Sequence, residues 1–203
     1  MVGRDVVFSV DKPPAHCGDV VFEARDLSYV DAGGRLRLDG VSLAVRRGEI
    51  VGIAGVEGNG QFELVQLATG LTPVQWGQVR ICGRDVTRAP VIERRKLMCY
   101  VPQDRKASGS AQKMSLADNA IMTHHCLNPR LESVWRALLS PGKCRRFAQG
   151  LVDTFGVLAP NVDTPISSLS GGNQQKVVVG REFLFDADFV LLDQPTRGVD
   201  VGS

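Results

Sequence analysis

Residues 169–176 read LSGGNQQK, and these residue types are typical of a helix whose N-terminus binds an anion. Ser170 is a good N-cap, and Gly171 and Gly172 have no side chain to cover the first backbone N–H groups. The apolar residues that follow, from Val177 to Leu184, predict that the helix continues. Because the N-terminus of a helix carries about half a positive charge, this stretch predicts a site for an anion, and above all for phosphate.

Two further stretches have the composition of phosphate-directed elements. Upstream, residues 55–62 read GVEGNGQF, a glycine-rich loop between an apolar run and a helical pattern. Strand, glycine-rich turn and helix is the context that a phosphate-binding loop requires. Downstream, the apolar residues 189–192 predict a short strand that ends at the acidic Asp193, before the sequence QPT.

The bulk composition is that of an ordinary globular protein. The chain has 203 residues, 43% hydrophobic and 23% charged, enough for one domain or for two lobes of one domain. The net charge of +2 gives no argument for nucleic-acid binding. No apolar run approaches the roughly 20 residues that span a bilayer, so we expect any membrane association to go through a partner. The five cysteines form no C-x-x-C pair, which favours reduced thiols and leaves a metal site as the alternative.

Periodicity predicts the elements that must position the glycine-rich loop. Residues 19–30 alternate as a strand and residues 41–45 form a second one, with a glycine-rich turn between them. Residues 49–54 are a near-continuous apolar run, which predicts a buried parallel strand leading into the loop. After the loop, apolar residues over 64–68 fall at helical spacing, and Gly70 is suited to end that helix.

The middle of the chain predicts two strands and then helices. Residues 77–83 and 97–101 have strand patterns. The region between the second strand and the stretch LSGGNQQK reads as helical, with one short helix over 116–122. One or two helices are expected over 131–155, interrupted at the sequence SPG of residues 140–142.

In this order, the glycine-rich loop, LSGGNQQK and the acidic strand end resemble the nucleotide-binding domain of an ABC transporter. The sequences GVEGNGQ, LSGGNQQK and QPTRGVDVG are similar to those of the C-terminal ATP-binding half of tandem importers for simple sugars and nucleosides. The resemblance covers most of the chain. It implies an α/β fold of the P-loop NTPase (ABC ATPase) class, with a mixed core sheet, flanking antiparallel strands, a helical lobe and the C-terminal part of the domain missing.

The resemblance also implies how the chain is divided. Residues 1–18 look like the linker between the two halves, which makes the chain a piece of a longer protein, although a disordered N-terminus is the alternative. Residues 19–101 and 177–203 are expected to form the nucleotide-binding core. Residues 102–176 are expected to form the helical lobe, which ends in the signature motif LSGGNQQK.

The family assigns ATP and Mg²⁺ to the glycine-rich loop. The residues expected to contact this half's own nucleotide are Gly55, Gly58, Asn59, Gly60, Gln61 and Phe62. An aromatic ring that stacks on adenine is expected just past the first strand. The nearest ring is Tyr29, slightly early, and Asp31 occupies much of the expected place, so a core or surface tyrosine is an equal alternative.

The remaining roles follow the order of the family's motifs. Gln103 is expected to reach the metal and the attacking water and to contact the membrane subunit, and Asp193 to support Mg²⁺. Gln194 stands in the catalytic position, and Asp200 would couple the two ATP sites. Since these domains work as head-to-tail pairs, the signature would serve the partner's ATP, through Ser170, Gly171, Gly172 and Gln174.

The sequence departs from the family pattern at three places. A working loop reads G-x-x-x-x-G-K-[ST], but Gln61 replaces the lysine and Phe62 the hydroxyl that holds Mg²⁺. A hydrogen bond to a charged group contributes roughly 1.5–3 kcal/mol, so losing the lysine weakens binding on the order of tenfold to a hundredfold. Gln194 replaces the glutamate that acts on water, and losing a general base costs about 10²–10⁴ in rate. No histidine of the chain stands where the family's switch histidine is expected, after Asp200.

These observations predict an asymmetric ATP-binding half of an importer for simple sugars or nucleosides. Its own site would bind nucleotide weakly, and its signature would complete the partner's site. We expect the protein to be a peripheral subunit at the cytoplasmic face of the membrane. The expected partners are the other ABC half, transmembrane permease subunits and, indirectly, a substrate-binding protein, and no nucleic acid. The alternatives are a non-transport ABC ATPase, or a non-hydrolysing nucleotide-binding or structural module. Co-purification with a permease would separate the importer from both.

Overall fold

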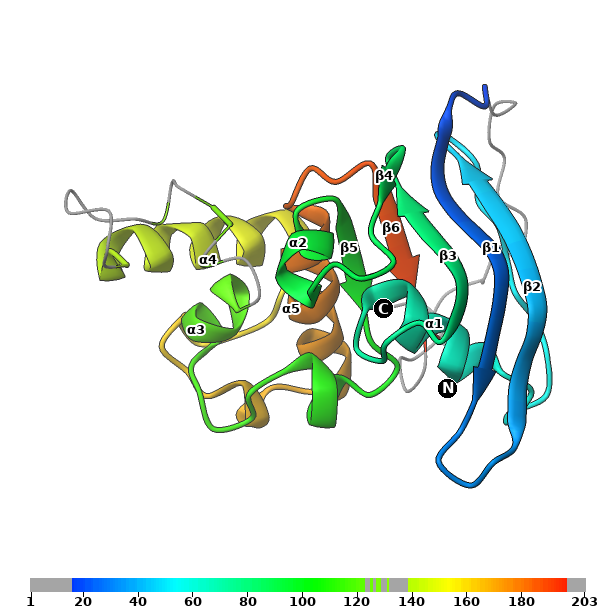
Figure 1. Ribbon diagram of the computed structural model, residues 1–203. Coiled ribbons are helices and arrows are strands. Elements are labelled where there is room, and N and C mark those ends of the chain that lie inside the picture. Colours follow the sequence, from blue (N-terminus) through cyan, green and yellow to red (C-terminus); the bar gives the residue numbers. More distant parts are fainter. Residues whose placement is uncertain (1–15, 123–124, 126, 129–130, 132–138, 197–203) are drawn as a thin grey trace, which may run out of the picture. The chain divides into compact units, whose positions relative to one another are not determined.

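The computed structural model describes residues 16–122, 125, 127–128, 131 and 139–196, and its contacts divide the chain into two compact units. The sheet unit holds the described residues of 16–100 and 187–191 (Figure 1). The helical unit holds those of 101–186 and 192–196. Most of the expected linker, residues 1–15, and the expected coupling residue Asp200 lie outside the described residues.

The sheet unit is built on a long antiparallel hairpin. Strands β1 (Val20–Val30) and β2 (Leu36–Arg46) pair with each other, and β3 (Trp76–Ile81) pairs with the other edge of β1 and with β4 (Arg84–Asp85), in the order β2-β1-β3-β4. These strands confirm the three predicted from the alternating patterns at residues 19–30, 41–45 and 77–83. The second strand begins earlier than predicted, because the turn after β1 is short.

Helix α1 (Gln61–Thr69) supplies the apolar layer of this unit. Its residues Leu64, Leu67 and Ala68 are buried in the same core cluster as the inner face of β1 and β3. The helix ends as predicted at Gly70, whose φ of 79° is in the left-handed region that suits glycine. The short helix α2 (Val91–Arg95) follows β4, and β5 (Met98–Val101) pairs with β6 (Phe189–Leu192) in a separate two-stranded sheet.

The prediction of a buried parallel strand at residues 49–54 is wrong. The structure has no strand there, and the apolar side chains of Ile50, Ile53 and Val56 are 86%, 56% and 75% exposed. A buried parallel strand needs hydrogen-bonded neighbours for its backbone, and β5 and β6 pair with each other instead. Within the described ranges no strand pairs with residues 49–54, so hydrophobicity alone does not bury this segment.

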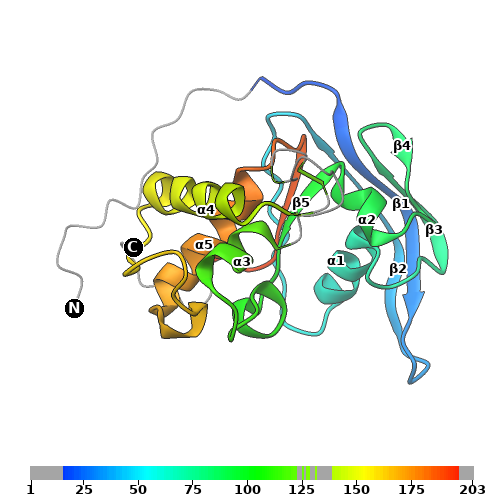
Figure 2. The ribbon, with the colours of Figure 1, turned by 90° about the vertical axis from the view of Figure 1, so that its left-hand side faces the viewer.

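The helical unit is a small bundle (Figure 2). Helix α3 (Leu116–Ile121) packs against α4 (Pro141–Phe155) and α5 (Gly171–Phe183), around a core that includes Leu116, Ala120, Leu151, Ile166 and Val177. A π-helical turn, η1 (Arg105–Gly109), precedes α3, and a 3₁₀ turn, η3 (Ile166–Ser168), precedes α5.

Two local signals in this unit are confirmed by the helix starts. Helix α4 begins at Pro141, within the interruption predicted at residues 140–142, because proline fits the first helical position, where no N–H partner is needed. Helix α5 begins after Ser170, as its capping residue predicts. The expected boundary between the helical lobe and the core, between residues 176 and 177, falls inside α5. The division of the chain into a nucleotide-binding core and a helical lobe stays a prediction.

Candidate functional site

The glycine-rich loop turns directly into α1. Gly58 and Gly60 have φ values of 92° and 95°, which L side chains rarely adopt, and Gly60 is the N-cap of the helix. The Asn59 N–H donates to the carbonyl oxygen of Val56 at 3.3 Å, which closes the turn. The loop therefore places the positive end of a helix dipole behind a turn of exposed backbone groups, as an anion site requires.

The side chain of Gln61 folds back over this loop. Its Nε2 donates to the carbonyl oxygen of Val56 at 3.3 Å, and a Cβ atom at Gly55 would collide with its carboxamide. The Phe62 side chain is 60% exposed, and its phenyl ring offers no ligand to a metal. The loop therefore keeps the backbone and helix end of a phosphate site but has a neutral amide where a cation is expected.

Tyr29 lies on β1, away from the loop in sequence and held in the sheet. Its ring is half-buried, packs against the core cluster of the sheet unit and faces Leu38 of β2 in the strand register. This environment is sufficient to explain a tyrosine as a packing residue. Its stacking on adenine stays a prediction.

Three of the expected residues follow the ends of β5 and β6. The Asp193 N–H donates to the carbonyl oxygen of Val101 at 2.9 Å, so the two strand ends lie side by side. Gln103 comes two residues after Val101 and is half-buried, as is Asp193. Gln194 is exposed and has a φ of 47°, a strained value for a residue with a side chain. The pairing of β5 with β6 thus brings Gln103, Asp193 and Gln194 to one edge.

The start of α5 is capped and open to solvent. The Ser170 Oγ accepts hydrogen bonds from the Asn173 side chain at 2.9 Å and from its backbone N–H at 3.4 Å. Asn173 is fixed in turn, because its Oδ1 accepts from the Leu158 N–H at 2.8 Å. Ser170 is exposed and Gly171 and Gly172 are half-buried, so the first amides of the helix are accessible to an anion.

Gln174 differs from the other signature residues, because its side chain is buried. Its Nε2 donates to the carbonyl oxygen of Leu169 at 2.9 Å, and its Oε1 accepts from Gln112 at 3.4 Å. The next residue, Gln175, donates from Nε2 to the carbonyl oxygen of Pro195 at 2.7 Å. The two glutamines therefore tie the start of α5 to the loop before α3 and to the segment after Gln194.

The donor set fits Mg²⁺ only in part. Among the described residues no three His, Cys, Asp or Glu side chains gather into a metal site. Mg²⁺ is commonly held by one or two carboxylates together with the oxygens of a phosphate substrate. Asp193 offers one such carboxylate, and Phe62 offers nothing, so a bound metal would depend on the oxygens of the nucleotide.

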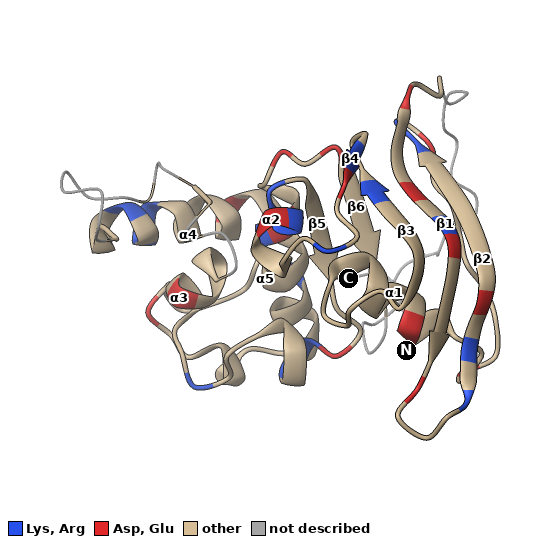
Figure 3. Cartoon of the chain, in the orientation of Figure 1, with Lys and Arg blue, Asp and Glu red and all other residues tan. Residues whose placement is uncertain are grey.

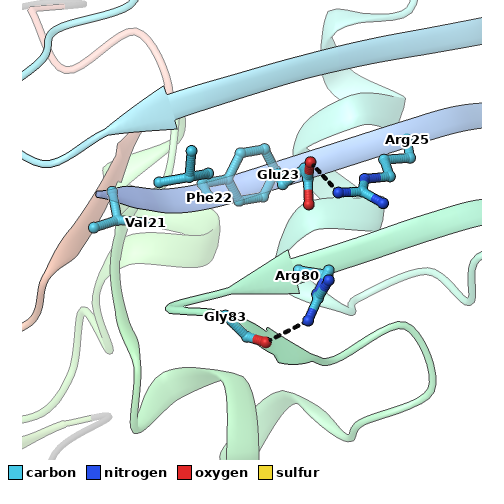
Figure 4. Close-up of a pocket in the computed structure, with 7 residues that line it drawn as sticks. Val21, Phe22, Glu23, Arg25, Arg80 and Gly83 are labelled. Atoms are coloured by element: carbon cyan, nitrogen blue, oxygen red, sulfur yellow. Dashed lines mark hydrogen bonds and ion pairs between the residues drawn. The ribbon is translucent and has the colours of Figure 1, made fainter. Parts of the chain in front are cut away.

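A hollow of about 250 Å³ on the sheet unit is not part of this chemistry (Figure 4). Its charged side chains make local contacts: Arg25 pairs with Glu23 at 2.7 Å, and Arg80 donates to the carbonyl oxygen of Gly83 at 2.8 Å. None of the residues expected to bind nucleotide line it.

A protein-family model described as ABC transporter matches residues 38–197. The chain belongs to the ABC transporter family. The match includes the glycine-rich loop, the signature and the strand that ends at Asp193, and family membership brings ATP, with Mg²⁺ as the usual metal. Within the described ranges, none of the helices combines the length and the apolar character needed to cross a lipid bilayer.

The chain is similar over its whole length to curated proteins that are named as import ATP-binding proteins. It is 40% identical over 205 residues to the nucleoside import ATP-binding protein NupA of Lactococcus lactis subsp. cremoris, covering 100% of this chain and 40% of that protein. It is 42% identical over 206 residues to the glucose import ATP-binding protein TsgD13 of Haloferax volcanii, covering 100% of this chain and 37% of that protein. The chain thus spans about two fifths of the length of these relatives.

Solved structures confirm the α/β ABC ATPase fold. The ATP-binding cassette MJ0796, in a dimeric post-hydrolysis state bound to ADP and Pi, matches with a TM-score of 0.74 at 20% identity, over 88% of this chain and 76% of that one. The protein cbiO1 of Clostridium perfringens matches with a TM-score of 0.67 at 20% identity, over 90% of this chain and 68% of that one.

Three residues whose side chains hold segments around the candidate site were not predicted from the sequence. They are Gln175, whose amide reaches Pro195, Asn119, whose side chain holds the loop before α3, and Arg37, which reaches the glycine-rich loop from β2. Gln175 stands within the signature sequence itself, which is a signal that it has a role. Asn119 and Arg37 belong to no motif, and only the fold brings them to their partners.

Proposed function

We propose that the chain is the second ATP-binding half of a tandem ABC ATPase that drives the import of a simple sugar or nucleoside. It would act at the cytoplasmic face of the membrane, together with a first ATP-binding half, transmembrane permease subunits and, indirectly, a substrate-binding protein. Relatives named as nucleoside, glucose, xylose and ribose import ATP-binding proteins support the substrate class. The asymmetry rests on one observation: the signature helix has an accessible start, whereas the chain's own loop has Gln61 in place of the lysine and Phe62 in place of the metal-binding hydroxyl.

The signature would bind the partner's ATP through the start of α5. Ser170 has its hydroxyl hydrogen available for a phosphate oxygen while Oγ still accepts from Asn173. Gly171 and Gly172 would present backbone amides without a side chain in the way. Gln174 would contribute by holding the carbonyl of Leu169, which fixes the turn before the helix.

This half's own loop would bind nucleotide weakly. The amides around Gly58, Asn59 and Gly60 would contact the phosphates, and the helix dipole of α1 would support them. Gln61 offers one neutral N–H in place of a lysine, and Phe62 offers no oxygen to Mg²⁺. Binding would therefore be on the order of tenfold to a hundredfold weaker than in a complete loop.

Hydrolysis at this site would also be poor. Asp193 supplies a carboxylate for Mg²⁺, and Gln103 beside it would contact the metal, the water and the membrane subunit. Gln194 can orient a water molecule by hydrogen bonds but cannot accept its proton at neutral pH. Asp200 would couple the two sites. The chemical step would therefore be left to the site on the partner's loop.

The test is the ATPase activity of the assembled full-length transporter. Gly171→Asp puts a carboxylate at the signature amides, and we expect it to abolish hydrolysis by repelling the partner's ATP. Gln61→Ala is expected to change the rate less than about twofold, since this loop contributes little. Gly142→Asp is the matched control, because Gly142 also lies at a helix start and its Cβ position faces open space. Equal losses from Gly171→Asp and Gln61→Ala would contradict the asymmetry.

A module that binds a partner without any hydrolysis is the second candidate. The lack of a lysine at 61, a hydroxyl at 62 and a carboxylate at 194 favours it for this half alone. Purification from native membranes separates the two: an importer half is recovered with a permease, and its complex hydrolyses ATP. A non-transport ABC ATPase would be recovered without a permease.

A further inference from the structure

Arg37 of β2 lies against the glycine-rich loop although it comes from the antiparallel hairpin. Its Nη1 donates a long hydrogen bond of 3.5 Å to the carbonyl oxygen of Gly58. The backbone is equally close, since a Cβ atom at Gly60 would lie 2.5 Å from the carbonyl oxygen of Arg37. The start of β2 and the loop are therefore in direct contact within the sheet unit.

Two carboxylates hold the guanidinium of Arg37 in place. The Asp31 Oδ2 lies 2.7 Å from Nε, and a Glu63 oxygen from the first turn of α1 lies 3.7 Å from the same atom. Glu63 is the acidic residue in the first turn of α1, and Figure 3 shows basic residues at this end of β2. Asp31 is fixed by the hairpin turn, because its Oδ1 accepts from the N–H groups of Gly33 and Arg35 at 2.8 and 3.0 Å.

This arrangement leaves part of the guanidinium for a ligand. Among the described residues, the partners of Arg37 account for Nε and Nη1, and the side chain is 28% exposed. Nη2 therefore has no hydrogen-bond or ion-pair partner within this part of the chain. A guanidinium is always charged and matches the geometry of phosphate oxygens, whereas the Gln61 amide that folds over the loop is neutral.

We infer that Arg37 is the cation that faces the polyphosphate of a nucleotide at this loop, in place of the lysine that position 61 lacks. The inference rests on the proposed function only in that the loop binds nucleotide at all. Asp31 and Glu63 compete with the phosphates for the same guanidinium, which keeps the affinity low. Removing the charge of Arg37 and removing the charge of Asp31 should therefore shift nucleotide affinity in opposite directions.

A purely structural role for Arg37 makes a different prediction. If the ion pair with Asp31 only holds the hairpin turn against the loop, then breaking it from either side has the same effect. The effect would also be independent of the number of phosphates on the ligand. The two roles are therefore separated by the sign of the Asp31 effect and by its dependence on the ligand.

The experiment measures ligand affinity by calorimetry on the full-length protein in which the phosphate loop of the first half has been inactivated. The ligands are ATP, inorganic tripolyphosphate and adenosine. Arg37→Met is expected to weaken ATP and tripolyphosphate roughly tenfold and to leave adenosine unchanged, with Arg37→Lys in between. Arg35→Met is the matched control, because Arg35 is exposed two residues away, and it should change nothing.

Asp31→Asn is the decisive second variant. Asparagine keeps an oxygen for the N–H groups of Gly33 and Arg35, so the turn is retained, but it frees Arg37 from its closest counter-charge. We expect ATP to bind about two- to threefold more tightly. Weaker binding of ATP in both variants, or an equal loss for adenosine, would overturn the inference.

The inference and the proposed function can fail separately. If Arg37→Met has no phosphate-dependent effect, or if the loop binds no ATP at all, Arg37 is not a ligand and the inference falls. The proposed function then still stands, provided that Gly171→Asp abolishes the ATPase activity of the transporter. If Gly171→Asp leaves that activity intact, the proposed function falls whatever Arg37 does.

Discussion

The Nη1 of Arg94 donates a 2.6 Å hydrogen bond to the carbonyl oxygen of Leu67, in the last turn of α1. The same guanidinium donates to Ala68 at 3.0 Å, Ala89 at 3.1 Å and Thr87 at 3.1 Å. Arg94 is buried, and its charge sits at the negative end of the helix dipole. The helix that begins at the glycine-rich loop is thus anchored at its other end by a single side chain.

Arg94→Met should therefore destabilise the sheet unit. Methionine fills much of the volume but leaves buried carbonyl oxygens without donors, so we expect a loss of about 3 kcal/mol in the free energy of unfolding. Urea denaturation of the two proteins measures it. Arg88→Met removes an exposed arginine of the same segment and should cost less than about 0.5 kcal/mol. Comparable losses in the two variants would show that Arg94 is not an anchor.

Asn119 makes the corresponding prediction for the helical unit. Its Oδ1 accepts from the Ala111 N–H at 2.8 Å, and its Nδ2 donates to the carbonyl oxygens of Ala111 and Ser115 at 3.1 and 2.9 Å. Asn119→Asp replaces the donor with a buried charge facing carbonyl oxygens, which should cost about 3 kcal/mol at neutral pH.

Asn161→Asp is the matched control for that substitution. Among the described residues, the Asn161 side chain bonds only through its Oδ1, which accepts from the Asp163 N–H at 3.0 Å and from the Thr164 hydroxyl at 3.2 Å. Aspartate has the same acceptor, so thermal unfolding should be unchanged. If both variants unfold at the same temperature as the natural protein, the bonds of Asn119 contribute little.

Asp85 gives a pH-dependent prediction. Hydrogen bonds from Thr87, and then from Gln78 at 2.6 Å, lower the pKa of Asp85 from 3.8 to about 2. Because the folded state favours the carboxylate, its contribution to stability is present above about pH 4 and is lost as the pH falls toward 2. Asp85→Asn should therefore unfold at a lower temperature at pH 7, and the difference should shrink between pH 4 and 2. A difference that stays constant down to pH 2 would contradict this assignment.

Gly60→Ala tests how closely the loop packs on β2. The φ of 95° penalises any side chain, and the new methyl group would meet the carbonyl of Arg37, so we expect a loss of about 2–3 kcal/mol. In Gly142→Ala the methyl group meets nothing, and stability should be equal or slightly higher because alanine favours the helix. Differential scanning calorimetry of the two variants compares them directly. Equal melting temperatures would mean that the loop moves away from β2 at little cost.

The parts of the fold predicted from the sequence are those that local chemistry determines. Ser170 as the cap of α5 and Gly70 as the end of α1 follow from hydrogen bonds and backbone preferences within a few residues. The prediction of a strand at residues 49–54 is wrong, because a strand depends on partners far along the chain. Hydrophobicity carries no information about which segments pair.

The candidate site divides in the same way. The glycine-rich loop and the signature were recognisable, because contiguous residues make each of them. The contact of Arg37 with Gly58 joins residues 21 positions apart, and that of Gln175 with Pro195 joins residues 20 positions apart. Both contacts exist only once the chain is folded. The sequence pattern also could not distinguish the exposed Ser170 from the buried Gln174, since burial of a polar side chain depends on what packs over it.

The exposed segment from Ile50 to Val56 has a practical consequence for anyone who purifies this chain. Seven consecutive residues carry no charge, four of them are large and apolar, and their backbone makes no ladder hydrogen bonds within the described part of the chain. Such a segment is a template for pairing with another copy, so the isolated chain should form concentration-dependent aggregates. Glu49 and Glu57 flank the segment, and the repulsion between these carboxylates on different copies opposes association. Replacing both with alanine should therefore shorten the lag before aggregates make the solution turbid.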